Sequence, residues 1–450
     1  MVAERETNSR LREAIAATGW TYEALARTVQ RVAAENGEVL RTNKSAVAHW
    51  VEGARPSGRS GWYLTEALSR RAGRVVSMAE IGLDPDEQML ADQDPVAAVI
   101  ELGRADVDRR QLLTAATFSV AGVAMPLTYD QEAVSRMLRA RTSLGLVGDR
   151  DIDVVCDTIV AFSAADNRLG GGHGLTAVAT YLADTAAPML RARFSSDALR
   201  RRAFGAVAEL AYLVGWKHHD LGQEGAAQRY YQVGYQLACE ADPHSLAAWM
   251  MRAIAHQALD LKQPRHCVDL MEKALDRSVG QMDGRSEAVL HIVHARACAS
   301  VGERTAAAQA ILAAENAFTR PDEPRPLFSA VAGPVVASTI AFHAAQALTD
   351  LADHAGAERQ HRGALLVWDP EKSRRVHGLT LADLGKSLAA QARAEEAVNA
   401  WSQALDLTDG MASNRTRKAI VSTRPTLATY RKRGVPGAAA LDRRVYEAYR

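Results

Sequence analysis

The clearest structural signal in the N-terminal part of the chain is RTNKSAVAHWVEGARP, residues 41–56. Asn43 can open a helix there, because its side-chain oxygen can accept a hydrogen bond from a backbone N–H of the first turn. Gly53 can end it, since a left-handed backbone conformation costs glycine little. Pro56 then carries the chain away, because proline cannot continue a helix. The stretch therefore predicts a short helix over about 43–51.

This predicted helix has two different faces. Small and polar side chains share one face, and large apolar side chains share the other. The first face holds Lys44, Ser45, Ala48 and His49, and the second holds Val47, Trp50 and Val51. A helix that enters the DNA major groove needs this combination, because one face must reach base edges while the other stays packed on its own domain.

The flanking sequence predicts a small helical domain around this segment. One helix covers about 9–18 and ends at Gly19, Thr21 caps a second helix, and another covers about 63–72. Each has apolar residues at helical spacing on one face: Leu11 and Ile15; Leu25, Ala26 and Val29; Leu64, Ala67 and Leu68. Four or five short helices around such a core form a helix-turn-helix domain.

Two segments, WTYEALA (20–26) and NKSAVAHWVEGARP (43–56), resemble the Cro/repressor-type (xenobiotic-response-element) helix-turn-helix family. In that family the second segment is the recognition helix. The resemblance implies that Lys44, Ser45 and His49, on a face shared with Ala48, contact base edges and that Asn43 caps the helix beside a phosphate. It also implies backbone contacts from Thr21, Tyr22, Arg55 and Arg59, and a core position for Val47 and Trp50.

Some alternatives stay open. Residues 28–42 (TVQRVAAENGEVLRT) are longer than the family's tight turn, so the second helix is extended or residues 35–40 form a loop or β-excursion. Lys44, Arg55 and Arg59 are alternatively solvated surface charges, and His49 alternatively covers Trp50. The whole head is alternatively a helical adaptor without DNA contact.

Composition gives the broad class. Aromatic residues make up only 6% of the 450 residues, and the high alanine content favours close-packed helices. Residues 1–75 hold 12 Lys and Arg against 8 Asp and Glu, whereas the remainder holds 42 against 45. A basic head on a slightly acidic body suits a polyanionic partner at the N-terminal end.

The cysteines and the apolar runs predict a cytoplasmic protein that does not enter a membrane. The four cysteines are widely spaced and form no CxxC pair, as expected for reduced, buried thiols. No apolar leader opens the chain, and no run approaches 18 apolar residues. Arg109-Arg110 and the apolar run after it resemble a twin-arginine export signal, but they lie too far inside the chain and predict a buried helix instead.

The rest of the chain divides at a polar, acidic stretch, residues 77–95. We predict a helix-turn-helix DNA-binding domain at 1–80, a linker and connecting helix at 81–130, and a helical-repeat sensory and dimerisation domain at 131–450. Early helices are predicted at 132–145 and 151–167. The glycine-rich loop 169–174 lacks the GK[ST] of a phosphate-binding loop and is predicted to be a flexible helix–helix connection.

An internal repeat runs through the body. A small residue is followed by a bulky one at +4 and a small one at +7, and the anchors are spaced 40, 40, 50 and 40 residues apart. The triplets are Ala227/Tyr231/Gly234, Cys267/Met271/Ala274, Ala307/Ile311/Ala314, Ala357/His361/Ala364 and Ala397/Trp401/Ala404. Twelve residues before each anchor lies another small residue: Gly215, Ala255, Ala295, Ala345 and Gly385.

The pattern resembles the tetratricopeptide repeat and predicts an all-α, right-handed superhelix of helix pairs with a concave face, capped by helices at about 418–433 and 437–449. A concave groove usually holds a peptide. Candidate effector-binding residues on the first helices are His218, His256, His291 and His294. His291, His294 and Cys298 share one helical face, but without a fourth ligand they are more readily packing residues than a metal site.

No catalytic motif is present, so the sequence predicts neither an enzyme nor a cofactor. The chain resembles actinobacterial helix-turn-helix regulators with a tetratricopeptide C-terminus and, more loosely, peptide-responsive regulators of Gram-positive bacteria. This resemblance implies a homodimer on a palindromic site of double-stranded DNA, because two-fold symmetry doubles the few contacts of one helix. A peptide, small molecule or protein signal in the superhelix would alter DNA binding. The alternative is a scaffold that binds protein partners and not DNA.

Overall fold

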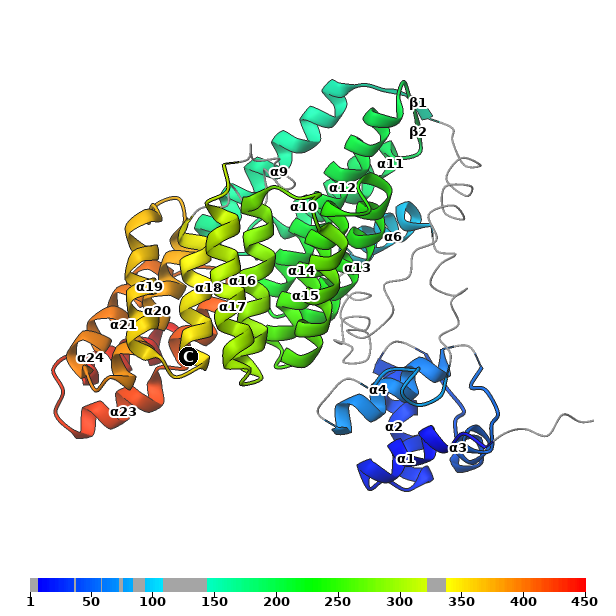
Figure 1. Ribbon diagram of the computed structural model, residues 1–450, viewed down its shortest axis with the longest axis horizontal. Coiled ribbons are helices and arrows are strands. Elements are labelled where there is room, and N and C mark those ends of the chain that lie inside the picture. The colour runs from blue at the N-terminus through cyan, green and yellow to red at the C-terminus, as the bar shows by residue number, and fades with distance from the viewer. Residues whose placement is uncertain are drawn as a thin grey trace, which may run out of the picture.

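The structure is a computed structural model, and it describes residues 7–35, 38–57, 59–72, 76–83, 94–107, 144–321 and 337–450 (Figure 1). These residues are almost entirely helical, which confirms the predicted all-α class. The strands in the described part of the chain are β1 (Leu144–Val147) and β2 (Ala192–Phe194), which pair in parallel. No helix there combines the length and the apolarity that crossing a bilayer requires.

The N-terminal unit contains α1 (Ser9–Thr18), α2 (Tyr22–Glu35), α3 (Lys44–Val51) and α4 (Ser60–Ala72). Both α1 and α2 pack on α3 and α4. Its apolar cluster runs from Leu11 to Leu83 and includes every inward-facing residue predicted for its helices. The second helix is the extended alternative, since α2 reaches Glu35, and residues 38–43 form neither helix nor strand.

Asn8 fastens three parts of this unit. Its side-chain oxygen accepts a hydrogen bond from the Leu11 N–H at 2.9 Å, so it caps α1. Its backbone N–H donates to the Val51 carbonyl at the end of α3, at 2.9 Å, and its side-chain amide donates to the Ile81 carbonyl, also at 2.9 Å. The end of α3 and the turn before residue 83 are thereby fixed to the start of α1.

Between this unit and the repeats lie α6 (Pro95–Val107), α9 (Asp149–Leu169), α10 (Leu175–Tyr181), the π-helical turn η2 (Leu182–Ala186), α11 (Ala187–Met189) and the two strands. Helix α6 falls in the stretch predicted as linker and connecting helix, and it packs on α10, η2 and α13. The predicted helix 151–167 is confirmed as the centre of α9. The predicted helix 132–145 is wrong at its end, because Leu144 and Gly145 belong to β1, and its earlier part lies outside the described residues, as does the segment after Arg109.

Within the described residues, five helix hairpins follow one another in the array (Figure 1). They are α12 (Asp197–Asp220) with α13 (Glu224–Ala241), α14 (Ser245–Asp260) with α15 (Pro264–Ser278), α16 (Gly284–Ser300) with α17 (Arg304–Phe318), α18 (Ala337–Asp350) with α19 (His354–Val367), and α20 (Arg374–Ala390) with α21 (Ala394–Thr408). Within each hairpin the two helices make their most extensive contacts with each other, and each hairpin packs on the next.

The repeat register predicted from the sequence is the register of these hairpins. Each anchor triplet lies on the second helix, and the small residue twelve positions earlier lies on the first. At Gly215 an added Cβ would lie 2.8 Å from the Tyr231 ring, and at Gly385 it would lie 2.2 Å from the Trp401 ring nitrogen. The small residue on the first helix therefore leaves room for the bulky side chain on the second helix, as the pattern predicts.

The turn inside each hairpin repeats as well. One residue of each turn has a positive φ, and these residues are Gly222, Lys262, Gly302, Ala352 and Ala392. Each precedes its anchor by five positions, so their spacing equals that of the anchors. Three of the five are not glycine, so the sequence alone does not mark this left-handed position.

The C-terminal helices are α22 (Asn414–Val421), α23 (Arg424–Lys432) and α24 (Ala438–Ala448). The prediction of a single helix over 418–433 is wrong. Helix α22 ends at Val421, and a new helix, α23, begins at Arg424 with Pro425 in its first turn. Apolar residues of the three helices share a cluster with α20 and α21, so they cap the last hairpin as predicted.

The end of the array also returns to its beginning. The Gly172 N–H donates to the Ala412 carbonyl and the Ala412 N–H donates to the Leu169 carbonyl, each at 3.0 Å. A Cβ added at Gly170 would lie 2.6 Å from the Ala412 oxygen. The glycine-rich loop does connect α9 to α10, as predicted. Backbone hydrogen bonds fix it to Ala412, and its glycines leave room for the residues before α22 to approach.

Buried charges line this junction. Asp166 on α9 accepts from Arg375 on α20 at 2.7 Å and from Lys217 on α12 at 3.4 Å. Asp220 accepts from the Gly171 N–H at 2.8 Å and from the Ser413 hydroxyl at 2.9 Å. Burial would raise the pKa of Asp166, but Arg375 and Lys217 hold it below its ordinary value. The first and last parts of the array are thus joined by a charge-assisted network.

Candidate functional site

Helix α3 begins and ends where the sequence predicts. The Asn43 side-chain oxygen accepts a hydrogen bond from the Ala46 N–H at 2.9 Å, so Asn43 is the N-cap. The helix ends at Val51, and Gly53 adopts a φ of 92°, which a residue with a side chain rarely adopts. These two local signals fix a helix of 8 residues.

The two faces of α3 are also as predicted. Val47, Trp50 and Val51 are buried in the core of the N-terminal unit. Lys44, Ser45 and His49 remain exposed in the intact chain, with 63% of the His49 side chain accessible, and Ala48 is half-buried. The described part of the repeat array therefore leaves this face uncovered.

The flanking residues have more varied surroundings. Asn43, Thr21 and Arg55 are exposed and Tyr22 is half-buried, while the Thr21 hydroxyl oxygen caps α2 by accepting from the Ala24 N–H at 3.2 Å. Arg59 is exposed but pairs with Glu38 at 2.8 Å, and His49 lies 3.3 Å from Glu52. A phosphate contact by Arg59 would have to use N–H groups other than the one that pairs with Glu38, or replace that bond.

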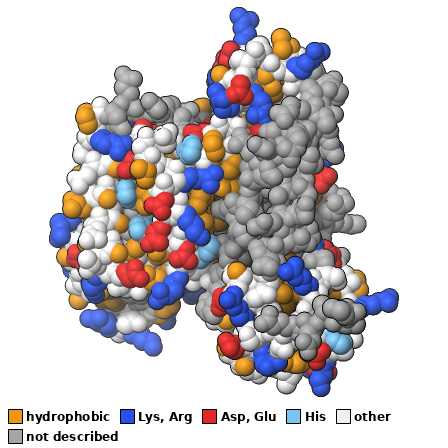
Figure 2. Space-filling view, turned by 45° about the vertical axis from the view of Figure 1, so that its right-hand side comes forward, with side chains coloured by type: hydrophobic (Ala, Val, Ile, Leu, Met, Phe, Trp, Pro, Cys, Tyr) orange, Lys and Arg blue, Asp and Glu red, His pale blue; other side chains and the backbone are white. Residues whose placement is uncertain are grey.

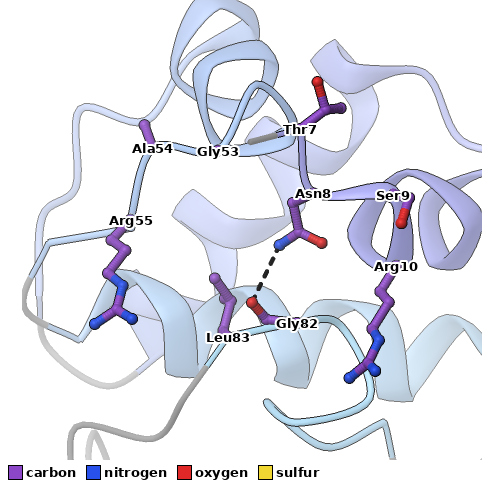
Figure 3. Close-up of a pocket in the computed structure, with 9 residues that line it drawn as sticks. All are labelled: Thr7, Asn8, Ser9, Arg10, Gly53, Ala54, Arg55, Gly82 and Leu83. Atoms are coloured by element: carbon purple, nitrogen blue, oxygen red, sulfur yellow. Dashed lines mark hydrogen bonds between the residues drawn. The ribbon is translucent and has the colours of Figure 1, made fainter. Parts of the chain in front are cut away.

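A polar pocket of ≈ 400 Å³ opens beside the end of α3 (Figure 3). Its lining comes from three segments that Asn8 holds together: Thr7 to Arg10, Gly53 to Arg55, and Gly82 with Leu83. Arg10 and Arg55 stand on two sides of it, and Lys and Arg side chains are spread over the face of the N-terminal unit seen in Figure 2. The pocket was not predicted, because its walls come together only through tertiary contacts.

The four histidines predicted to bind an effector do not form one group. His218 is fully buried, with Nε2 2.8 Å from Asp106 on α6. His256 is 4% exposed and lies in the interior of the array. The side chains of His291 and His294 are 22% and 16% exposed on α16, and His294 Nε2 lies 3.4 Å from the sulfur of Cys298.

His256 belongs instead to a group that the sequence analysis missed. His219, His256 and Asp260 place one ligand-type atom each within 4.8 Å of one another. His219 also bonds Glu224 at 2.8 Å through Nδ1. The polar run KHHD, residues 217–220, which follows the largely apolar stretch 203–216, was the available signal.

All four cysteines are free thiols. Three are buried and Cys156 is half-buried. Burial raises the pKa of the thiols of Cys239 and Cys298 to about 11, so they are protonated at neutral pH. They act as packing residues.

A family model described as the SP15 N-terminal domain matches residues 11–84. The match covers the segment whose apolar cluster runs from Leu11 to Leu83, so it coincides with the N-terminal unit. No curated protein matches the chain. The fold thus defines an all-α helical-repeat protein with a small N-terminal helical unit.

Proposed function

We propose that this protein is a sequence-specific DNA-binding transcription regulator whose helical-repeat array binds an effector. The observation that carries the proposal is α3, a capped helix with an exposed face of Lys44, Ser45 and His49 and a buried back. Its length and its outward polar side chains suit the major groove. A homodimer on a palindromic site would double the contacts of this one short helix.

The array supplies a place where an effector could act. Its first and last parts meet through buried charged side chains and backbone hydrogen bonds, so a ligand that binds inside the array would alter the curvature of the whole array. Such a ligand can shift DNA binding only by its different affinity for the two curvatures. Binding of the effector would then change the relative position of the two N-terminal units in a dimer.

Binding of the full-length chain to genomic DNA fragments, measured by gel shift and fluorescence anisotropy, tests the proposal. Lys44→Ala should weaken binding by roughly 1–3 kcal/mol and lower the slope of affinity against salt. Lys418→Ala is the matched control, because it removes the same charge from an exposed site on α22. His49→Ala and Ser45→Ala should relax the preference for the bound sequence.

Failure of the full-length protein to bind DNA at low salt would exclude the regulator and favour a protein-binding scaffold. If DNA is bound but His49→Ala and Ser45→Ala leave the preference unchanged, the protein binds DNA through a surface other than α3.

A further inference from the structure

The interior of the array holds a cluster of ionisable side chains from five helices. They are His219 on α12, Arg252, His256 and Asp260 on α14, Arg296 on α16, His343 on α18 and Arg415 on α22. All but Asp260 and Arg415 are at least nine-tenths buried. The cluster lies within the array, away from α3, and plays no part in the DNA contacts proposed above.

One carboxylate faces several cations in this cluster. Asp260 lies 3.2 Å from His219, 3.5 Å from Arg415 and 3.6 Å from Arg296. Burial would lower the pKa of His219, but Asp260 and Glu224 raise it above its ordinary value, so this ring favours the charged form. Glu224 lies on the other side of His219. Two carboxylates therefore face three cations, His219, Arg296 and Arg415, and Arg252 is a further positive charge.

Arg252 has no acidic partner among the described residues. It is 6% exposed, it donates to the Tyr212 hydroxyl at 3.0 Å, and its guanidinium lies over the Trp249 ring at 4.4 Å. Its Nε has no hydrogen-bond partner. Aromatic faces compensate a buried guanidinium only in part, so a full positive charge remains without a counter-charge.

Two histidines beside Arg252 are also incompletely bonded. Neither ring nitrogen of His256 has a hydrogen-bond partner in the part of the chain that the structure describes, although Nε2 lies 3.5 Å from Asp260. His343 accepts from Arg296 at 3.3 Å, and its ring lies 5.5 Å from that of His256. Burial is the largest cause that holds the pKa of His343 well below its ordinary value, and the nearby charges of Arg296 and Arg252 lower it further.

A metal ion does not suit this environment. His219, His256 and Asp260 have the residue types of a metal site, but two guanidinium groups lie within 3.6 Å of the same carboxylate. Both ring nitrogens of His219 already face carboxylates, at 2.8 and 3.2 Å. A divalent cation would add to an excess of positive charge, whereas an anion would neutralise it.

We propose that the interior cluster binds the anionic group of an effector, a carboxylate or a phosphate, between Arg252, Arg296 and the rings of His256 and His343. Arginine offers the paired N–H donors that such groups accept. The proposal deepens the proposed function, since the anion would be part of the effector that the array senses. The bound anion would neutralise the charges of Arg252 and Arg296, and this would tighten the contact between three consecutive hairpins.

Thermal unfolding of the full-length chain without DNA tests the site directly. Inorganic phosphate and, separately, citrate are titrated at constant ionic strength against chloride. We expect Tm to rise with the concentration of at least one of these anions, because an anion that binds the folded state stabilises it. The anion that raises Tm identifies the group as phosphate or carboxylate.

Arg252→Met should weaken the effect of the anion by about tenfold, and should leave Tm in chloride unchanged or higher, since it removes an uncompensated buried charge. Arg265→Met is the matched control on the exposed surface of α15, and should keep the full response. Arg296→Met should also lose the response, and this second variant tests the same site independently of Arg252→Met.

Three results would overturn the site: no rise in Tm with either anion, an unchanged response in Arg252→Met and Arg296→Met, or a large fall in the Tm of Arg252→Met in chloride. Because no DNA is present, these results are independent of the DNA-binding test. Loss of the anion response with intact DNA binding would contradict only the effector site.

Discussion

The packing of the last hairpin makes a quantitative prediction for Gly385→Ala. Gly385 lies on α20 opposite Trp401 on α21, and an added Cβ would lie 2.2 Å from the indole nitrogen and 2.4 Å from the adjacent ring carbon. The indole N–H donates to the Ala382 carbonyl at 3.0 Å, and Trp401 is 2% exposed. Moving the ring away from the added carbon would therefore strain this bond in a close-packed core.

Two opposing effects set the magnitude. Alanine in place of glycine inside a helix gains about 1 kcal/mol in helix propensity. Overpacking of a close-packed core costs about 1–3 kcal/mol, and an atom placed this close belongs at the upper end. We expect Gly385→Ala to lower the free energy of unfolding by about 2 kcal/mol.

Gly363→Ala is the matched control, because Gly363 is exposed on α19 and a Cβ there meets nothing within 4 Å. It makes the same chemical change without the clash, so it should stabilise the protein by about 0.5–1 kcal/mol. The difference between the two variants isolates the contact with Trp401.

Urea unfolding of both variants, followed by far-UV circular dichroism and tryptophan fluorescence, measures this difference. Equal effects of the two substitutions, or a stabilising effect of Gly385→Ala, would refute the packing argument and with it the physical basis of the repeat register.

Three further predictions follow from caps and buried charges. Asn43→Ala should cost about 1 kcal/mol of α3 stability, seen as a roughly fivefold faster hydrogen exchange of α3 amides with α1 amides unchanged; equal protection would contradict the cap. Burial, with Arg296 and Arg415, lowers the pKa of His256 to about 4. As pH falls from about 6.5 to 4, His256 is therefore protonated in the unfolded state before it is protonated in the folded state, and the free energy of unfolding falls by at most about 3 kcal/mol. His256→Gln should reduce this loss, as measured by urea unfolding at a series of pH values. Arg375→Ala leaves Asp166 without its closest cation and should cost about 3–5 kcal/mol in thermal or urea unfolding, whereas a loss below 1 kcal/mol would show that the junction is held mainly by its backbone bonds.

The sequence was sufficient for features that depend on residues a few positions apart. The bounds of α3 follow from Asn43 and Gly53, and its buried back follows from the spacing of Val47, Trp50 and Val51. The pairing of Gly215 with Tyr231 and of Gly385 with Trp401 follows from the fixed distance between them in each repeat. Such signals are local, because the helix period and one short turn determine which side chains meet.

Contacts between distant segments could not be predicted in this way. The pairing of β1 with β2 and the contact of Gly172 with Ala412 depend on where other elements lie. His218 and His256 were predicted to face a groove, but the array and its neighbouring helices enclose both. Small rotations between successive hairpins add up along the chain, and no single repeat contains their sum.

The all-α class, the capped helix with an exposed polar face and the register of the repeats could be predicted from the sequence, because each depends on spacings within one or two helices. The return of the segment before α22 to α9 and α12, and the burial of Arg252 without an acidic partner among the described residues, could be seen only in the folded structure. Both depend on the accumulated curvature of the array, which brings together side chains that lie far apart in the chain.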